Sequence, residues 1–223
     1  MFQFKQFTIE QDRCGMKVGT DGVLLGSWAQ GGTSVLDVGT GTGIIALMMA
    51  QRYPEAQVVA IDIDEGAVCQ ATANVAASPF AAQISVEQAK VQDMGDTLDG
   101  RFDAVVSNPP FFIDSLQAPD RQRNVARHAE TLTYAELMKA ASRLLSDDGE
   151  LSVIVPFDYR RRMDDEAIFQ GLFPSRVCAV KTTPNKPVRR YLLAYRKQPC
   201  RCEQAELVIG DEVYRRLTSD FYL

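Results

Sequence analysis

The chain has 223 residues, of which 46% are hydrophobic, and this length suffices for one large domain with a sizeable core. The net charge of −5 by itself points away from nucleic acid, and the sequence has neither an apolar run of membrane-spanning length nor a signal-peptide pattern. The single histidine, His128, excludes histidine-rich metal sites, and five scattered cysteines argue against a disulfide framework. We therefore expect a cytoplasmic protein with free thiols, no membrane segment and no metal.

Strand and helix patterns alternate along most of the chain. The expected strands are 34–40, 57–63, 83–89, 102–108, 149–156, 176–183 and 189–197. The expected helices are 43–53, 65–77, 133–145 and 158–173, and Thr133 is a suitable N-cap for the third. This alternation predicts an α/β fold with a seven-stranded, mostly parallel sheet and helices on both faces.

A glycine-rich loop, DVGTGTG, joins the first predicted strand to the first predicted helix, where a nucleotide cofactor loop would lie. Its notable positions are Asp37, Gly39, Gly41 and Gly43. Glycines let the backbone approach a ligand closely, and Asp62, at the end of the next strand, can accept both ribose hydroxyls of an adenosine. Asp64 is the alternative, although we expect it to face solvent. The weaker hypotheses are a ligand-free turn and a nicotinamide enzyme, whose loop spacing differs.

The spacing D-x-G-x-G-x-G resembles motif I of the S-adenosylmethionine-dependent methyltransferases. This resemblance implies a Rossmann-like class I methyltransferase fold and S-adenosylmethionine as cofactor.

The stretch SNPPFF comes at the end of the predicted strand 102–108. Two prolines end a strand and stiffen the loop after it, so this is either a loop that tucks its phenylalanines into the core or a rigid clamp. It resembles motif IV of the amino-methyltransferases, and on that basis we favour the clamp. The Asn108 side-chain oxygen and the Pro109 carbonyl would accept the two N–H bonds of an exocyclic amine, Pro110 would stiffen the loop, and Phe111 would stack on the base.

Segments over essentially the whole chain resemble the bacterial tRNA1(Val) (adenine(37)-N6)-methyltransferases. They are residues 4–29, with KVGTDG, the glycine loop and its helix, SNPPFF, ARHAETLTYAELM and the closing DFYL. The resemblance implies methyl transfer to the exocyclic N6 of adenine 37 in the anticodon loop of valine tRNA. It also implies a single domain over 1–223, with a motif X segment at 1–33 and a catalytic core at 34–200. Thr20 and Asp21 would lie near the methionine end of the cofactor.

Several other classes compete with this interpretation. The alternatives are a small RNA methyltransferase that acts on guanine N2 and a protein glutamine N5-methyltransferase. The glutamine enzymes add an N-terminal helical domain, and DNA adenine methyltransferases usually add a recognition domain, for which the sequence has no room. A non-catalytic binding module is the non-enzyme alternative, and the intact NPPF argues against it.

The sequence does not assign a single role to Lys90 or to His128. Lys90 stands where related enzymes usually carry an aspartate near the cofactor adenine, so backbone groups, Gln92 or Asp93 would have to substitute. His128 is expected to be a surface or helix-start residue, with a place at the substrate mouth as the alternative.

The charge is unevenly spread. From Ala167 to Cys202 there is no acidic residue, while eight residues are basic. We expect an RNA-contacting surface there, formed by Lys181, Lys186, Arg189 and Arg190. The alternative is a solvated strand pair whose basic residues face acids such as those at 164–166.

Overall fold

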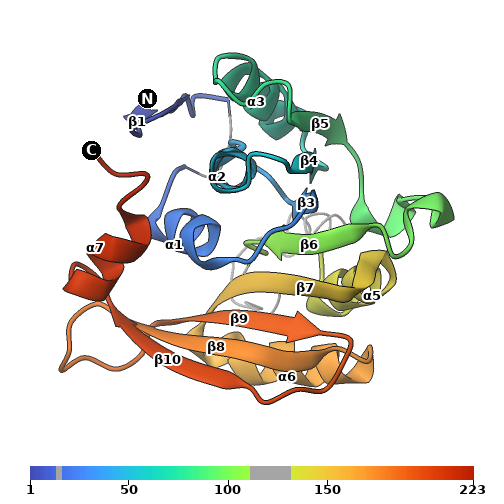
Figure 1. The fold of residues 1–223 in the computed structure, drawn as a ribbon, viewed down its shortest axis with the longest axis vertical. Helices are drawn as coiled ribbons and strands as arrows, with labels where there is room; N and C mark the ends of the chain where they lie inside the picture. Colours follow the sequence, from blue (N-terminus) through green and yellow to red (C-terminus); the bar gives the residue numbers. More distant parts are fainter. Residues whose placement is uncertain (14–16, 111–131) are drawn as a thin grey trace, which may run out of the picture.

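The computed structural model describes residues 1–13, 17–110 and 132–223, and its centre is an eight-stranded sheet (Figure 1). The order across the sheet is β10-β8-β9-β7-β6-β3-β4-β5. The strands are β3 (Ser34–Val38), β4 (Gln57–Asp62), β5 (Ile84–Gln88), β6 (Phe102–Ser107), β7 (Leu145–Pro156), β8 (Phe173–Lys181), β9 (Arg190–Arg196) and β10 (Glu203–Val208). Among the described strands of this sheet, β9 alone runs antiparallel to its neighbours, which confirms the mostly parallel sheet that the sequence predicts.

The prediction of seven strands is wrong by one. The additional strand is β10, which pairs in parallel with β8 at the edge of the sheet. Residues 203–206 are exposed, and three of the four are polar, so this strand lacks the apolar alternation by which strands are recognised. Both β10 and α7 (Glu212–Thr218) lie beyond residue 200, where the sequence places the end of the catalytic core.

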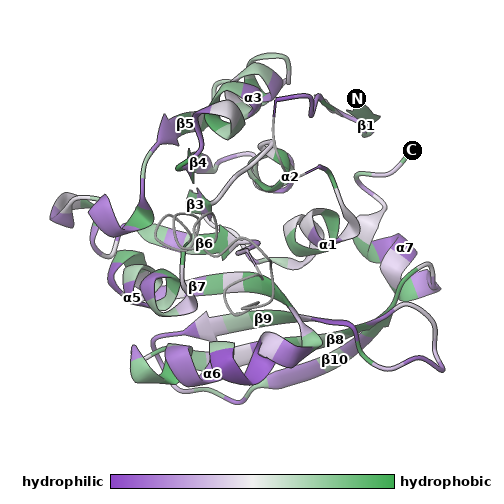
Figure 2. Ribbon diagram, turned by 180° about the vertical axis from the view of Figure 1, so that it is seen from behind, coloured by the Kyte–Doolittle hydropathy of each residue, from purple (hydrophilic) through white to green (hydrophobic). Residues whose placement is uncertain are grey.

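Helices cover both faces of the sheet, as predicted. On one face lie α1 (Thr20–Trp28), α2 (Ile44–Arg52), α3 (Glu65–Ala76) and α7; on the other lie α5 (Tyr134–Leu144) and α6 (Arg160–Phe169). Hydrophobic residues gather along the central strands between these layers, whereas hydrophilic residues predominate on α6 (Figure 2). The two faces thus bury two apolar layers against one sheet.

The start of α5 agrees closely with the prediction. Thr133 is the N-cap: its Oγ1 accepts a hydrogen bond from the Glu136 backbone N–H at 3.2 Å, and the Glu136 carboxylate accepts one from the Thr133 N–H at 2.9 Å. This reciprocal pair is a capping box, which satisfies two backbone donors at a helix start.

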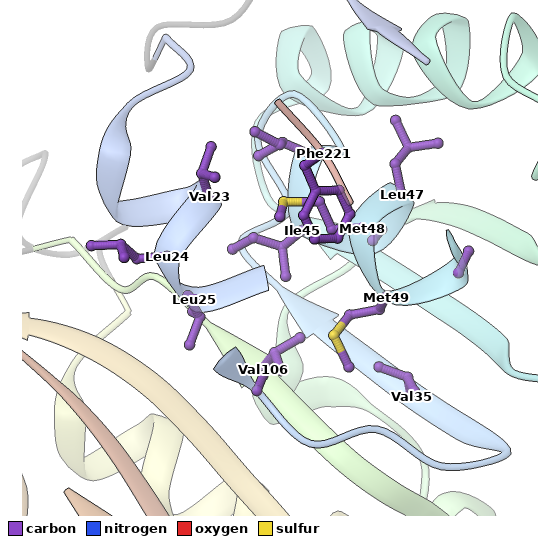
Figure 3. Packing of buried hydrophobic residues seen from close by; sticks show 14 of the residues in the cluster. Val23, Leu24, Leu25, Val35, Ile45, Leu47, Met48, Met49, Val106 and Phe221 are labelled. Carbon is purple, nitrogen blue, oxygen red and sulfur yellow. The ribbon is translucent and has the colours of Figure 1, made fainter. Parts of the chain in front are cut away.

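The packing of α1 against α2 supports the N-terminal part of the site. Val23 and Leu25 of α1 and Ile45 and Met48 of α2 belong to one buried cluster, which Figure 3 shows. A Cβ at Gly26 would lie only 2.6 Å from the Met48 Sδ, so the glycine permits the close approach of the two helices. These contacts hold α1 against α2.

The two chain termini lie side by side (Figure 1). The short strands β1 (Phe2–Gln3) and β2 (Thr8–Ile9) form an antiparallel pair, and the Lys5 N–H donates to the Phe221 carbonyl at 2.9 Å. Phe4 and Phe221 are both buried in the core. In the described part of the chain, no helix has the length and apolar character that crossing a membrane requires.

Candidate active site

A cavity of about 320 Å³ opens where β3 and β6 end. Its described walls come from three segments far apart in the sequence: residues 17–22 at the start of α1, residues 39–42, 44 and 45 after β3, and Asn108 after β6. Ligands of open α/β sheets bind outside the carboxyl ends of the strands, where the strand order reverses. This cavity lies at such a place, because β3 has β4 on one side and β6 on the other.

The glycine loop has a backbone that other residues rarely adopt. Gly39, Gly41 and Gly43 have φ angles of 72°, 55° and 82°. A Cβ at Gly39 would meet no atom within 4 Å, so this glycine borders open space. A Cβ at Gly43 would lie 3.3 Å from the Cβ of Ala71, so the close neighbour of Gly43 is α3. Gly39 and Gly41 line the cavity, whereas Gly43 shapes the turn beneath it.

Asp37 lies beneath the loop and is fully buried. Its Oδ2 accepts hydrogen bonds from the Thr40 hydroxyl at 2.6 Å and from the Ala46 N–H at 3.1 Å, and its Oδ1 has no partner among the described residues. Burial raises the pKa of Asp37 to about 7, against these two hydrogen bonds. Its contacts indicate that Asp37 positions the loop, since the described cavity lining does not include it.

Asp62 and Asp64 have different environments. The Asp62 carboxylate accepts hydrogen bonds from the Gly41 N–H at 2.9 Å and the Asp64 N–H at 3.0 Å. Asp64 is exposed and caps α3, accepting from the Gly66 N–H at 2.7 Å, as expected of a residue at the start of a helix. A carboxylate has about four acceptor sites, so Asp62 retains acceptor capacity, although the described cavity lining includes its partner Gly41 and not Asp62 itself.

Residues 17–22 form a second wall, and Thr20 and Asp21 belong to it. The Asp21 carboxylate accepts a hydrogen bond from the Arg190 Nε at 2.9 Å and forms an ion pair with it. Arg190 is the first residue of β9, so this contact joins the start of α1 to the far half of the sheet.

Asn74 of α3 ties the N-terminal segment to the glycine loop. It is buried, and its side chain accepts from the Glu10 N–H at 2.9 Å and donates to the Glu10 carbonyl at 2.9 Å and the Thr42 carbonyl at 2.8 Å. Nothing in the sequence marked Asn74 for this role, because its partners lie 64 and 32 positions away.

Asn108 comes directly after β6 and lines the cavity. Its side-chain Oδ1 is buried and has no hydrogen-bond partner among the described residues. Buried polar atoms are nearly always paired, so this oxygen is an unused acceptor in a residue that lines the cavity. Pro109 is buried and Pro110 half-buried beside it. Phe111 and His128 lie outside the described residues.

Lys90, which stands where related enzymes usually carry an aspartate, has an acidic neighbour. Lys90 precedes a short turn at Val91–Asp93, and Lys90 and Gln92 both interact with Glu136 at the start of α5. Burial acts to raise the pKa of Glu136, but hydrogen bonds from Thr133 and Gln92 and the charge of Lys90 outweigh it, and the pKa is lowered. Residues 88–93 are absent from the described cavity lining.

The four predicted RNA-contacting residues lie at the same end of the sheet as Asn108, where β6, β7 and β8 finish and β9 begins. Strand pairing brings the start of β9 opposite the end of β7 and the end of β8, as the pairs Pro156–Arg190 and Val180–Arg190 show. Two of the four have acidic partners: Lys181 pairs with Glu206 at 2.8 Å and Arg190 with Asp21. Lys186 and Arg189 are exposed in the connection between β8 and β9.

Sequence reasoning overlooked part of the cavity wall. Thr40, Thr42, Ile44 and Ile45 line it next to the glycines, and Lys17 to Gly19 precede the residues predicted there. The glycine spacing pointed to the loop, but which of its side chains face the cavity depends on the turn geometry. Over the described residues, no group of three or more His, Cys, Asp or Glu side chains is arranged to hold a metal ion.

Comparisons with known proteins identify the family. The family model "Methyltransferase small domain" matches residues 19–176. The tRNA1(Val) (adenine(37)-N6)-methyltransferase of Bacteroides fragilis is 44% identical over all of this chain and 97% of its own length. The proteins of the same name from Phocaeicola vulgatus and Trichodesmium erythraeum are 46% and 42% identical, with the same shares covered. The chain belongs to the tRNA1(Val) (adenine(37)-N6)-methyltransferase family. It is a methyltransferase.

Solved structures of methyltransferases share the fold of this family member. A predicted O-methyltransferase from Agrobacterium tumefaciens has a TM-score of 0.67 at 19% identity and covers 90% of this chain and 96% of its own. A putative RNA methyltransferase from Pyrococcus horikoshii has a TM-score of 0.53 at 20% identity and covers 76% of each chain. At these identities the likeness concerns the fold, and it agrees with the Rossmann-like class I architecture predicted from the sequence.

Proposed function

We propose that this enzyme transfers the methyl group of S-adenosylmethionine to the exocyclic N6 of adenine 37 in a valine tRNA, as its curated relatives are named for doing. The observation that carries the proposal is the unpaired acceptor oxygen of Asn108, a residue that lines the same cavity as the glycine loop. A methyl donor on the loop and an amine on Asn108 would then lie within one cavity.

The residues around the loop fit the cofactor. Gly39 borders open space that a side chain would fill, and Asp62 has acceptor capacity for the two ribose hydroxyls. Thr20 and Asp21, on the opposite segment of the wall, suit the polar methionine end. When bound, S-adenosylmethionine supplies a methyl group already activated on a sulfonium, so the protein has to bind and orient rather than activate.

The amine of adenine is a poor nucleophile because its lone pair is delocalised into the ring. The Asn108 oxygen and the Pro109 carbonyl accept its two N–H bonds, which holds the nitrogen in place and directs the lone pair toward the cavity. Pro109 and Pro110 restrict the backbone at this point. Phe111 stacks on the base in this proposal. No strong base is needed, since the proton leaves after transfer.

The basic residues at the same sheet edge provide the contact with RNA. Lys186 and Arg189 are exposed there and suit backbone phosphates. Lys181 and Arg190 lie at the same edge, each next to a carboxylate, and contribute to this surface less directly. A loop adenine can be unstacked at modest cost, so the anticodon loop suits the clamp better than a duplex.

The test is methylation of total tRNA with labelled S-adenosylmethionine, and then nucleoside analysis. The label should appear as N6-methyladenosine, in valine tRNA alone. A valine tRNA transcript with guanosine in place of adenine 37 is the matched control and should accept no label. Label in N2-methylguanosine, or in glutamine of a protein substrate instead of tRNA, would replace this function with one of the two alternatives.

A further inference from the structure

An exposed aromatic side chain lies at the end of the sheet where Asn108 also lies. Phe157 comes directly after β7 and is 52% exposed, and its ring stacks on that of Tyr191, with centroids 5.9 Å apart and planes at 26°. Single exposed apolar residues are common on protein surfaces. The position and surroundings of Phe157 therefore have to carry any functional argument.

The position of Phe157 results from strand order. β7 lies next to β6 and parallel to it, with Val153 opposite Ser107. Asn108 follows β6 and Phe157 follows β7, so both residues lie at the same end of the sheet. Strand spacing and rise place the two residues on the order of 10 Å apart. Phe157 lies on the side of Asn108 away from the glycine loop, because β3 borders β6 on the other side.

Two arginines neighbour the pair of Phe157 and Tyr191. The Arg160 guanidinium lies 4.5 Å from the centroid of the Tyr191 ring and pairs with Asp164 at 3.4 Å, so Tyr191 is held from α6. The Phe157 N–H donates to the Arg189 carbonyl at 3.1 Å, so the backbones of Phe157 and the exposed Arg189 lie side by side. Arg160 and Phe157 thus both contact the Tyr191 ring, and about half of the Phe157 surface is exposed to solvent.

We propose that the open ring of Phe157 stacks on a nucleobase that flanks the target adenine, while Arg189 contacts the adjoining phosphate. Aromatic rings stack on any base, and unstacked loop nucleotides are the part of RNA that proteins bind in this way. The proposal rests on the proposed function and adds a second base site, which would hold the loop open while Asn108 holds the target.

The test compares Phe157→Ala with Phe169→Ala. Phe169 is 82% exposed at the end of α6. The chain then enters β8 at the other end of the sheet from Asn108, so Phe169 serves as an exposed phenylalanine away from the site. Phe157→Ala should raise KM for valine tRNA by roughly 5- to 150-fold, with unchanged affinity for S-adenosylhomocysteine by calorimetry. Phe169→Ala should change neither. Phe157→Trp, which keeps a stacking ring, should restore most of the tRNA affinity.

A spectroscopic readout separates stacking from general contact. Valine tRNA with 2-aminopurine next to adenine 37 should lose fluorescence on binding the wild-type protein and lose less on binding Phe157→Ala. Equal tRNA affinity in wild type and Phe157→Ala, or equal losses in the variants at 157 and 169, would overturn the proposal. If Phe157→Ala does not fold, Phe157→Leu gives the same comparison. Failure of the proposed function appears separately, as a wild-type enzyme that does not methylate tRNA.

Discussion

Asn108 carries a buried acceptor oxygen without a partner among the described residues. Such an atom costs roughly 1–3 kcal/mol of stability unless something else satisfies it. A residue kept only to end β6 would not need an unpaired side-chain acceptor next to the cavity. The oxygen is therefore the single group of the site whose state points most directly to a substrate.

Replacing Asn108 tests this assignment. Asn108→Ala should keep its affinity for S-adenosylhomocysteine but lose turnover on tRNA by about 10²–10³, because one preorganised contact to the reacting amine is removed. The variant should still fold, since the Oδ1 atom that it loses has no partner among the described residues. Single-turnover methylation and calorimetry measure the two properties. Activity above about a tenth of the wild type would mean that Asn108 only ends the strand.

Asp37 predicts a pH dependence of stability. Burial raises its folded-state pKa to about 7, above the ordinary value of 3.8, so the folded state holds a proton that the unfolded state has lost over that range. Stability contributed by this group is present at low pH and is lost as the pH rises through about 7. Asp37→Asn lacks this titration.

Urea unfolding of the ligand-free protein at about pH 5 and pH 8 checks the prediction. Relative to the wild type, Asp37→Asn should gain on the order of 2 kcal/mol of unfolding free energy between the two values. Asp64→Asn, the same replacement at an exposed position, is the matched control. Parallel pH profiles for Asp37→Asn and the wild type would show that the carboxyl is ionised throughout.

The glycine loop can be separated into its structural and its binding contributions. Gly39 and Gly171 have similar φ angles, 72° and 75°, and a Cβ would meet no atom within 4 Å at either position. Alanine at each should therefore cost a similar amount of stability, about 1 kcal/mol. Only Gly39→Ala should also weaken binding of S-adenosylmethionine, because its methyl group enters the cavity. Calorimetry that shows equal cofactor affinity in both variants would contradict the loop assignment.

The contacts of two neighbouring arginines, where the chain passes from β8 into β9, predict different roles for them. Arg189 is exposed, whereas Arg190 pairs with Asp21 of the cavity wall. Arg189→Gln should weaken tRNA binding and flatten its salt dependence by roughly 0.7 log units per lost phosphate contact. Arg190→Gln should act mainly on cofactor affinity. Binding titrations at several salt concentrations decide this, and an unchanged slope for Arg189→Gln would place the RNA surface elsewhere.

At the scale of the whole molecule, the two ends of the chain close the core around α1 and α2. Phe221 is 1% exposed, packs in the same cluster as Phe4, and its carbonyl receives the Lys5 N–H. This layer supports the segment that forms the wall of the cavity, so the closing DFYL contributes to the fold although it is far from the site in sequence.

Removing the buried ring of Phe221 should destabilise the fold. Phe221→Ala should lower the unfolding free energy by about 3 kcal/mol, since a buried ring leaves a cavity. Leu223→Ala is the matched control: Leu223 is 82% exposed, and its loss should change stability by less than about 0.5 kcal/mol. Chemical denaturation of both variants measures the difference. Equal stability in the two would mean that the C-terminal segment is dispensable for folding.

The sequence by itself determined the parts that depend on neighbouring residues. Alternating apolar periods predicted the α/β sheet, Thr133 marked the start of α5, and the glycine spacing located the loop at the end of β3. These features are local, because a period, a cap or a turn is specified within a few positions. The same holds for SNPP, where proline chemistry ends β6.

Only the tertiary structure decided which distant segments share the site. The contact between Asp21 and Arg190 spans 169 positions, and it places a residue predicted for RNA against one predicted for the cofactor. Likewise, Phe157 and Asn108 come at the same end of the sheet only because β7 pairs in parallel with β6. The strand β10 was overlooked because an exposed edge strand has no apolar period. Strand order is set by how apolar faces pack together, and local periodicity does not encode it.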